Sequence, residues 1–467
     1  MKRPLRNLLS LAWADLGSRA IGFFVTVYLA RVLGPAAYGL VGVGLAVLGH
    51  AQLLSSPGMQ VVEARNAARP DGVNPSRFGA VITLRLLLSL GLFVIVGGLL
   101  MALPLEPSTT RVILWSLVVL FPLAIAPDWF LQGRERMLPV GIGRIGGYLV
   151  YGAAVWMLVH TPDDVAMAPA AYGAGALATS FILWIAVSHA FPLPRFAPDV
   201  RLWISILREN LPVGVAVFVG QQVMNLPPIL LATMRTTSEA GVYNAALKLV
   251  FLLLALDRVL NALLLPALTR VRETRPADLQ RMAGLTTRSV AVLAGLIIVP
   301  GMCIAPLMMQ LVFGSAYAEA GMVARILLVY VGLTLVNSVA VCVLLASGRE
   351  RLYTRAMIIG SLALAAAMVV LTPLWGTAGT ALGAVLGELV TVLLMVRGAS
   401  REVRVFTREA LIRPLIASAC AAVPGLALVS WSAPGAAAAS VGAFVAATGA
   451  MKVFNAADVS YLKERFL

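Results

Sequence analysis

The residues of this chain that could do chemistry are cationic side chains placed inside long apolar segments. Arg19, Arg85, Lys248 and Arg258 each lie within a mostly apolar stretch that is long enough to cross a bilayer. A charged side chain at the centre of a membrane costs about 2.5–3.5 kcal/mol on insertion scales, so such residues usually face a cavity or a partner. We therefore predict that these four residues line a cationic cavity for an anionic headgroup, because guanidinium groups bind phosphate in a bidentate manner.

Acidic side chains accompany these cations. Asp15 precedes Arg19 by four positions, a spacing at which two helical side chains can pair. Asp257 and Arg258 are adjacent, so they point about 100° apart on a helix and each needs another partner. Glu388 lies near the centre of a separate apolar segment. We predict these acids as secondary polar residues of the cavity; the alternative is that acids and cations form charge pairs joining helices.

Two amides form another candidate group. Gln221 and Asn225 share one helical face just before Pro227 and Pro228, which are expected to break the helix beside them. The amides are predicted to line the cavity, and hydrogen bonding between helices is the alternative.

Other polar residues in the apolar segments have simpler explanations. Arg144 and Asp128 lie within about one turn of a segment end, where snorkelling to the membrane surface accounts for them. His50, Gln52 and Gln60 are interpreted as hydrogen-bonded residues of a helix bundle, with cavity lining as the alternative.

Signatures of enzymes and cofactor sites are absent from the sequence. The chain has three scattered cysteines, three histidines, no P-loop and no HExxH motif, so we expect no metal, no cofactor and no enzymatic activity. The segment 141–146 matches GxGxxG, but it opens an apolar helix and follows no strand. Gly379, Gly383 and Gly387 at four-residue spacing instead predict close helix packing.

The elements that must hold these residues are membrane helices. The chain is 60% hydrophobic and 12% charged, with a mean hydropathy of +0.91, whereas soluble chains carry roughly 25% charged residues. We predict an all-α integral membrane protein with about fourteen transmembrane helices. The predicted spans are 8–33, 38–62, 78–103, 111–131, 139–159, 168–190, 210–234, 242–269, 286–312, 321–346, 356–374, 377–396, 411–431 and 435–453.

Basic residues predict the orientation of these helices. One set of alternate connections, which includes both termini, holds 26 Lys and Arg residues, and the other set holds about three, at Arg31, Arg111 and Arg235. The positive-inside rule then places both termini in the cytoplasm. It also explains the net charge of +15 without nucleic acid. The N-terminal apolar stretch is interpreted as a retained first helix, because Asp15 and Arg19 interrupt it.

The chain carries one unit twice. The segment 33–39 (LGPAAYG) is echoed by 237–243 (TSEAGVY), and each opens an apolar run of similar length. Gly39 aligns with Gly241, which gives an offset of 202 positions. Two parallel six-helix lobes are therefore predicted, and Gln221 corresponds to Arg19 at this offset. The predicted divisions are an N-lobe (1–190), a cytoplasmic amphipathic linker (191–209), a C-lobe (210–396) and two trailing helices with a cytoplasmic tail (397–467).

These segments resemble the polysaccharide-transporter branch of the multidrug/oligosaccharidyl-lipid/polysaccharide flippase superfamily. The matching residues are 30–39 (ARVLGPAAYG), 128–133 (DWFLQG), 238–248 (SEAGVYNAALK) and 265–266 (LP). The resemblance implies a V-shaped bundle of two six-helix lobes that alternates access. It also implies a cationic cavity for the pyrophosphate of a polyprenyl-linked oligosaccharide, with Arg19 where relatives often carry a cavity arginine.

The expected function is that of a flippase for lipid-linked oligosaccharides in a bacterial inner membrane, serving surface polysaccharide biosynthesis. Its expected partners are the lipid-linked oligosaccharide, membrane lipids, and a polysaccharide polymerase with glycosyltransferases. A cation-coupled multidrug exporter of the same architecture is the first alternative, but it would want acidic cavity residues, and no acidic cluster is obvious. A membrane glycan ligase or polymerase is the second, although the connections 105–110 and 161–167 are short for such an enzyme.

Overall fold

The computed structural model describes residues 2–69, 74–191, 198–405, 407–428, 431–451 and 453–454; for 2–16, 408 and 409 it describes the backbone only. All regular elements in these ranges are helical. They are α1 (Lys2–Ser55), α2 (Met59–Ala67), α3 (Pro75–Ala102), α4 (Pro107–Val118), α5 (Leu120–Ile125), α6 (Asp128–Gly133), α7 (Met137–Leu158), η1 (Pro162–Ala166), α8 (Met167–Ser188), α9 (Val200–Gly220), α10 (Gln222–Met234), α11 (Thr237–Leu253), α12 (Ala255–Thr274), η2 (Pro276–Asp278), α13 (Leu279–Phe313), η3 (Ser315–Tyr317), α14 (Ala320–Ala346), α15 (Glu350–Ala399), α16 (Arg408–Leu428) and α17 (Ala433–Ala450).

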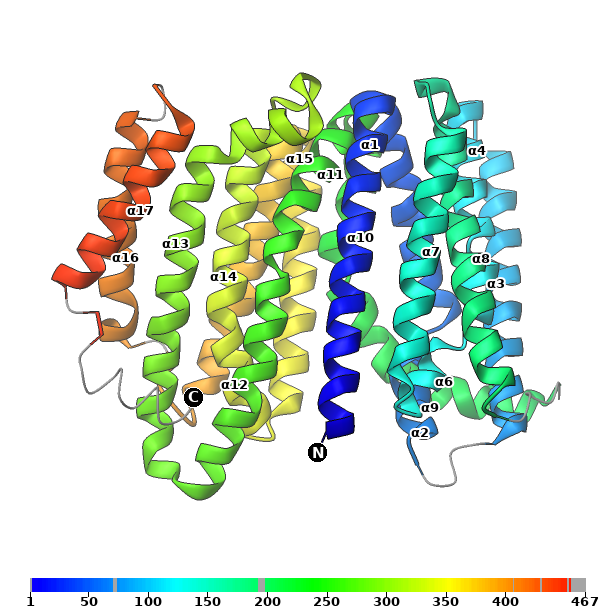
Figure 1. Cartoon of the computed structure of the whole chain (residues 1–467), viewed down its shortest axis with the longest axis horizontal. Helices are drawn as coiled ribbons and strands as arrows, with labels where there is room; N and C mark the ends of the chain where they lie inside the picture. Colours follow the sequence, from blue (N-terminus) through cyan, green and yellow to red (C-terminus); the bar gives the residue numbers. More distant parts are fainter. Residues whose placement is uncertain are drawn as a thin grey trace. The chain divides into compact units, whose positions relative to one another are not determined.

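The predicted all-α membrane fold is confirmed (Figure 1). Within the described residues, 12 helical segments are long and apolar enough to cross a membrane. Two of them contain a glycine with positive φ, Gly34 in α1 (φ 71°) and Gly376 in α15 (φ 55°). Such a conformation is strained for residues with a Cβ, and it interrupts the helix. Each of these segments is therefore two helices, which brings the number to the predicted fourteen.

Local sequence explains where several helices begin. Asn74 caps α3, since its side chain accepts hydrogen bonds from the backbone N–H groups of Ser76 and Arg77. Pro75 then occupies the first helical position, where no N–H is needed. Asp199 caps α9 in the same way.

The chain divides into two units, Met1–Gly241 and Val242–Leu467. Helices α9 and α10 belong to the first unit, although α9 begins within the predicted linker and both helices extend into the predicted C-lobe. The lobe boundaries derived from the repeat stay a prediction. Residues 192–197 of the predicted linker and 455–467 of the predicted tail lie outside the described residues, as does the side chain of Asp15.

The first unit has an aromatic core between α3, α6 and α8. Phe78 of α3 stacks on Phe130 of α6 with ring centroids 4.5 Å apart, and on Trp184 of α8 at 5.8 Å. Trp129 meets Phe78 edge to face at 5.3 Å. These contacts hold α6, the short last part of the fourth predicted span, against α3 and α8.

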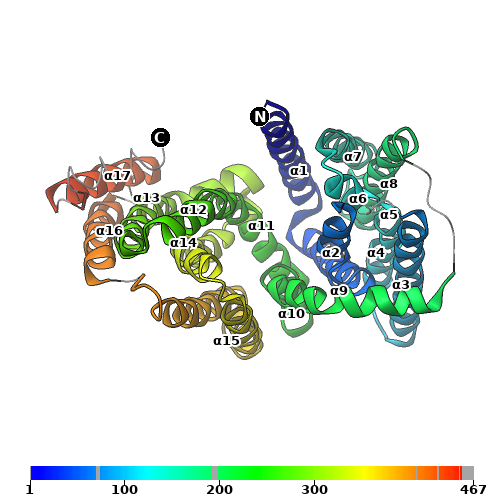
Figure 2. The same ribbon diagram turned by 90° about the horizontal axis from the view of Figure 1, so that it is seen from below.

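In the second unit, α14 packs against α12, α13 and α15, as Figure 2 shows from below. The two halves of α15 meet through the predicted small-residue face. A Cβ placed on Gly379 or Gly387 would overlap Leu371 or Leu364, and one on Gly383 would lie 2.7 Å from a side-chain carbon of Met368. The prediction of close helix packing at these glycines is therefore confirmed.

Large apolar side chains cover the outside of both units. Phe24, Trp156 and Leu426 are 71%, 70% and 75% exposed in the isolated chain. Exposed apolar side chains such as these suit the hydrocarbon core of a membrane, where no protein partner has to cover them.

Candidate functional site

The fourth predicted span is broken into α4, α5 and α6. Ala126 is extended (φ −65°, ψ 121°), and Pro127 separates α5 from α6. A proline has no N–H, so Pro127 cannot donate to the carbonyl of Leu123, four residues earlier. Carbonyls freed in this way inside a membrane need other donors, and broken helices are found where they face protein or a cavity.

Side chains from two neighbouring helices supply those donors. Arg85 of α3 donates from Nη2 to the carbonyl of Leu123 (2.6 Å) and from Nη1 to that of Ala126 (3.1 Å). From α8, Ser180 donates to the carbonyl of Pro122 (2.7 Å), and Trp184 Nε1 donates to that of Ile125 (2.8 Å). These four hydrogen bonds from α3 and α8 stabilise the break between α5 and α6.

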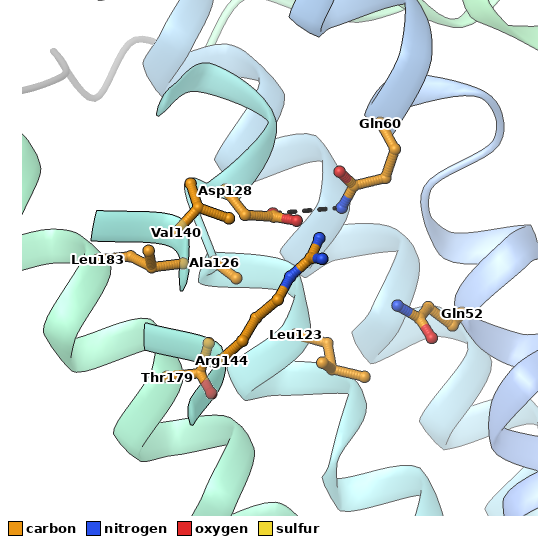
Figure 3. A pocket seen from close by; sticks show the side chains of 9 residues that line it. All are labelled: Gln52, Gln60, Leu123, Ala126, Asp128, Val140, Arg144, Thr179 and Leu183. Atoms are coloured by element: carbon orange, nitrogen blue, oxygen red, sulfur yellow. Dashed lines mark hydrogen bonds between the residues drawn. The ribbon is translucent and has the colours of Figure 1, made fainter. Parts of the chain in front are cut away.

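A cavity of about 100 Å³ with mixed polar and apolar walls lies beside the break (Figure 3). This volume is well above the roughly 10–15 Å³ that holds one water molecule. Its polar lining comes from five helices, and its apolar lining is Leu123, Ala126, Val140 and Leu183. The polar residues are Gln52 of α1, Gln60 of α2, Asp128 of α6, Arg144 of α7 and Thr179 of α8.

Two of the side chains in the cavity, those of Gln60 and Arg144, extend toward Asp128 at the start of α6 (Figure 3). Gln60 donates a hydrogen bond to Asp128 Oδ1 (3.3 Å), and the guanidinium of Arg144 extends toward this pair (Figure 3). Asp128 occupies the first turn of α6, where the helix dipole favours a carboxylate. The guanidinium and the two amides can donate hydrogen bonds to phosphate or sugar oxygens, and the carboxylate can accept from hydroxyl groups. The Thr179 hydroxyl already donates to the backbone carbonyls of Gly143 and Gly175.

The sequence did not single out this group. Arg144 and Asp128 were expected to snorkel because they lie near span ends, yet both line the cavity. Gln52 and Gln60, expected mainly as bundle residues, line it too. The two prolines at 122 and 127 were the available signal, because broken helices accompany sites in transporters.

A second polar contact joins α1 to α9 and α10. His50 Nε2 lies 3.2 Å from Gln222 Oε1, and the His50 ring meets Phe218 edge to face at 5.6 Å. Asn225 packs so closely on Gly49 that a Cβ there would lie 2.7 Å from its amide nitrogen. Gln221 is exposed, so the amide facing α1 beside Asn225 is Gln222.

The helix interruption expected at Pro227 and Pro228 lies elsewhere. α10 runs through both prolines, and the chain breaks earlier, at Gln221. The carbonyls that lose their donors to these prolines belong to Val223 and Met224, four residues back, in the first turn of α10. The interruption at Gln221 therefore lies six residues before Pro227. The expected break at Pro227 was wrong.

An ionic network ties α2 and α3 to α9. Arg77 donates to both carboxylate oxygens of Glu63 (2.9 and 2.7 Å) and to Glu209 (2.7 Å). Glu63 is 1% exposed and also accepts from Asn210 Nδ2 (2.9 Å). Asn66 Nδ2 donates to Glu209 at 3.0 Å. From the sequence, Arg77 is distinguished only as one of the basic residues between the second and third predicted spans.

In the second unit, the two predicted acids meet α14 at adjacent residues. Asp257 of α12 accepts a hydrogen bond from Ser338, and Glu388 of α15 accepts one from Asn337 Nδ2 (3.3 Å). Asn261, one turn after Asp257, accepts from the thiol of Cys342 (3.2 Å). The structure thus brings together carboxylates that lie far apart in the sequence.

The four predicted cations are divided between the units. Arg19 lies partly buried in the first half of α1, and Arg85 is 2% exposed and held on the carbonyls of the α5–α6 break. Lys248 of α11 and Arg258 of α12 are exposed in the isolated chain. That these residues bind substrate stays a prediction. The contacts of Arg85 favour a role in supporting the broken span.

Comparisons with known proteins agree on the class of protein. A family model described as polysaccharide biosynthesis protein matches residues 5–272. A candidate O-antigen transporter of Escherichia coli (strain K12) is 25% identical over 250 residues, which cover 52% of this chain. The chain spans about three fifths (59%) of the length of that curated relative.

Solved structures share the fold. The lipid II flippase MurJ in an inward closed conformation superposes with a TM-score of 0.74 at 11% identity, covering 95% of this chain and 98% of MurJ. An inward-facing multidrug resistance transporter of the MATE family, in the MOP superfamily, gives a TM-score of 0.66 at 16% identity, with coverages of 82% and 94%. At these identities the likeness concerns the fold alone.

Proposed function

Because the chain belongs to the polysaccharide biosynthesis protein family, we propose that it is a flippase for a polyprenyl-diphosphate-linked oligosaccharide in the bacterial inner membrane. The chain is a multi-pass membrane protein with a fold shared by lipid and drug transporters. The observation that carries the proposal is the match to this family in a chain whose membrane helices contain guanidinium groups. Arginine suits a diphosphate because it offers bidentate, permanently charged donors.

In this proposal the substrate enters from the face that carries the basic connections, which is the cytoplasmic face by the positive-inside rule. Arg19 in the first unit and Arg258 in the second each bind phosphate oxygens during transport. The cavity beside α6 offers further donors for oxygen-rich groups, from Gln52, Gln60 and Arg144. The lipid tail stays in the bilayer. Glycosyltransferases that build the substrate and a polymerase that consumes it are the expected partners.

Charge reversal at two arginines tests this function. We expect Arg19→Glu combined with Arg258→Glu to abolish complementation of a flippase-deficient strain, because carboxylates repel the diphosphate. Arg111→Glu is the matched control, since Arg111 is an exposed residue near the start of α4, and it should complement normally. Membrane levels of each variant are measured by immunoblot. Normal complementation by the double variant at wild-type levels would remove these arginines from the substrate path.

A cation-coupled multidrug exporter is the second candidate function, and one observation favours it. Asp257 and Glu388 flank α14 and hydrogen bond to its adjacent residues Ser338 and Asn337, which supplies paired acids that the sequence did not show. If the protein exports drugs, deletion of its gene lowers drug resistance, and Asp257→Asn with Glu388→Gln fails to restore it. The flippase proposal expects unchanged drug resistance and a defect in surface polysaccharide, which glycan staining of the same deletion strain detects.

A further inference from the structure

Helix α9 (Val200–Gly220) runs across the ends of its neighbours in the first unit. Figure 1 draws it across the lower ends of α2 and α3, and Figure 2 shows its length from below. Glu209 of α9 accepts hydrogen bonds from Asn66 at the end of α2 and from Arg77 at the start of α3. The connection that leads into α9 belongs to the basic set. By the positive-inside rule, the first half of α9 is therefore expected at the level of the cytoplasmic headgroups.

One face of α9 is buried, and another is apolar but exposed. Ile206 and Asn210 are fully buried, and Asn210 donates to Glu63 of α2. Four large apolar side chains are between 45% and 60% exposed and form the α9 stripe: Val200, Ile204, Leu211 and Val215. At the angular step of an α-helix they lie within about 60° of one another. The middle of the stripe is more than about 100° away from both buried residues.

Two arginines border the α9 stripe. Arg201 and Arg208 are exposed, and they lie about 20–40° beyond one edge of the stripe. The acids beside them are engaged elsewhere: Asp199 accepts from backbone N–H groups of the first turn, and Glu209 accepts from Arg77. Among the residues that the structure describes, neither guanidinium has an ionic partner. Both are therefore available to a ligand with negative charge.

We propose that α9 binds anionic phospholipid of the cytoplasmic leaflet, with headgroup phosphates on Arg201 and Arg208 and acyl chains against the α9 stripe. An apolar face with basic residues along its edge is typical of helices that lie in a membrane interface. There a guanidinium binds phosphate through charge-assisted hydrogen bonds. The two arginines are two turns apart, about 10 Å along the helix. That separation suits neighbouring phospholipid headgroups better than the adjoining phosphates of one diphosphate.

Lipid binding to the purified full-length protein in detergent tests this site. Native mass spectrometry gives the affinities for phosphatidylglycerol and, as the zwitterionic reference, phosphatidylcholine. We expect Arg201→Gln with Arg208→Gln to weaken phosphatidylglycerol binding about tenfold and to leave phosphatidylcholine binding unchanged. Arg111→Gln with Arg235→Gln is the matched control, because it removes the same charge from two exposed arginines of the other set of connections. This control should bind both lipids like the wild type.

Three outcomes would overturn the lipid site. They are wild-type affinity of the Arg201/Arg208 variant for phosphatidylglycerol, an equal loss in the control, or displacement of the lipid by millimolar glycerol 1-phosphate. The last would show a site for free phosphate, and displacement by a soluble prenyl diphosphate would likewise contradict the phospholipid assignment by showing a substrate subsite.

The salt dependence of wild-type binding decides if the double variant does not fold. Raising the salt concentration from about 0.05 to 0.5 M should weaken phosphatidylglycerol binding, because salt screens exposed charges. Binding that does not change with salt contradicts the proposal. A drug exporter would give the same lipid result, so failure of the proposed transport function leaves this test standing.

Discussion

Replacing Arg85 with methionine should lower the free energy of unfolding by about 3–5 kcal/mol, because the change strands two buried carbonyls at a helix break. The carbonyls of Leu123 and Ala126 each lose a guanidinium donor. The residue is 2% exposed, so water cannot replace the guanidinium without entering the bundle. The measurement is denaturant unfolding of purified protein in detergent, with the amount of monodisperse protein as a second readout.

Arg111→Met is the control for this change. Arg111 also donates to a backbone carbonyl, that of Pro107 at 3.3 Å, but it is exposed, and its loss should cost less than about 0.5 kcal/mol. Arg85→Lys should fall between the two, since one ammonium cannot reproduce the forked geometry that spans both carbonyls. Wild-type stability of Arg85→Met together with lost transport would contradict the supporting role and return Arg85 to the substrate site.

Removing the positive charge of Arg77 should be comparably costly. Arg77→Met leaves the carboxylate of Glu63, 1% exposed, without its bidentate partner, and breaking a buried pair from one side costs about 3–5 kcal/mol. Adding Glu63→Gln to Arg77→Met should recover much of that loss, because the uncompensated charge disappears. Unfolding of the two single variants and the double variant gives the coupling energy directly.

The exposed pair Arg235–Glu239 is the reference for this cycle. Its nitrogen–oxygen distance of 3.1 Å is similar, but both side chains are accessible, so Arg235→Met should cost less than about 1 kcal/mol. If Arg77→Met unfolds like Arg235→Met, the network between α2, α3 and α9 does not stabilise the fold. An equal loss in the single and double variants would show that Glu63 is not the charge left uncompensated.

The membrane helices of this protein were predictable because hydropathy accumulates along a continuous segment. Fourteen spans follow from apolar runs, and the break within α1 follows from Gly34 before Pro35. The packing face at Gly379, Gly383 and Gly387 was predictable too, because residues at four-residue spacing lie on one face of the same helix.

The partners of the polar residues were decided by tertiary structure. Arg85 meets α5 because Pro127 frees a carbonyl there and α3 lies alongside. Asp128 and Arg144 share a cavity although their positions near span ends predicted snorkelling.

Hydropathy, residue spacing and charge along the chain were enough to predict the membrane class, the number of helices, the repeat and the supply of charged side chains. Tertiary structure alone decided that Gln222 rather than Gln221 faces α1, and that Asp257 and Glu388 meet on α14. The physical reason is that apolar burial sums over a whole span, whereas the partner of a polar group depends on how each helix is rotated and where it breaks.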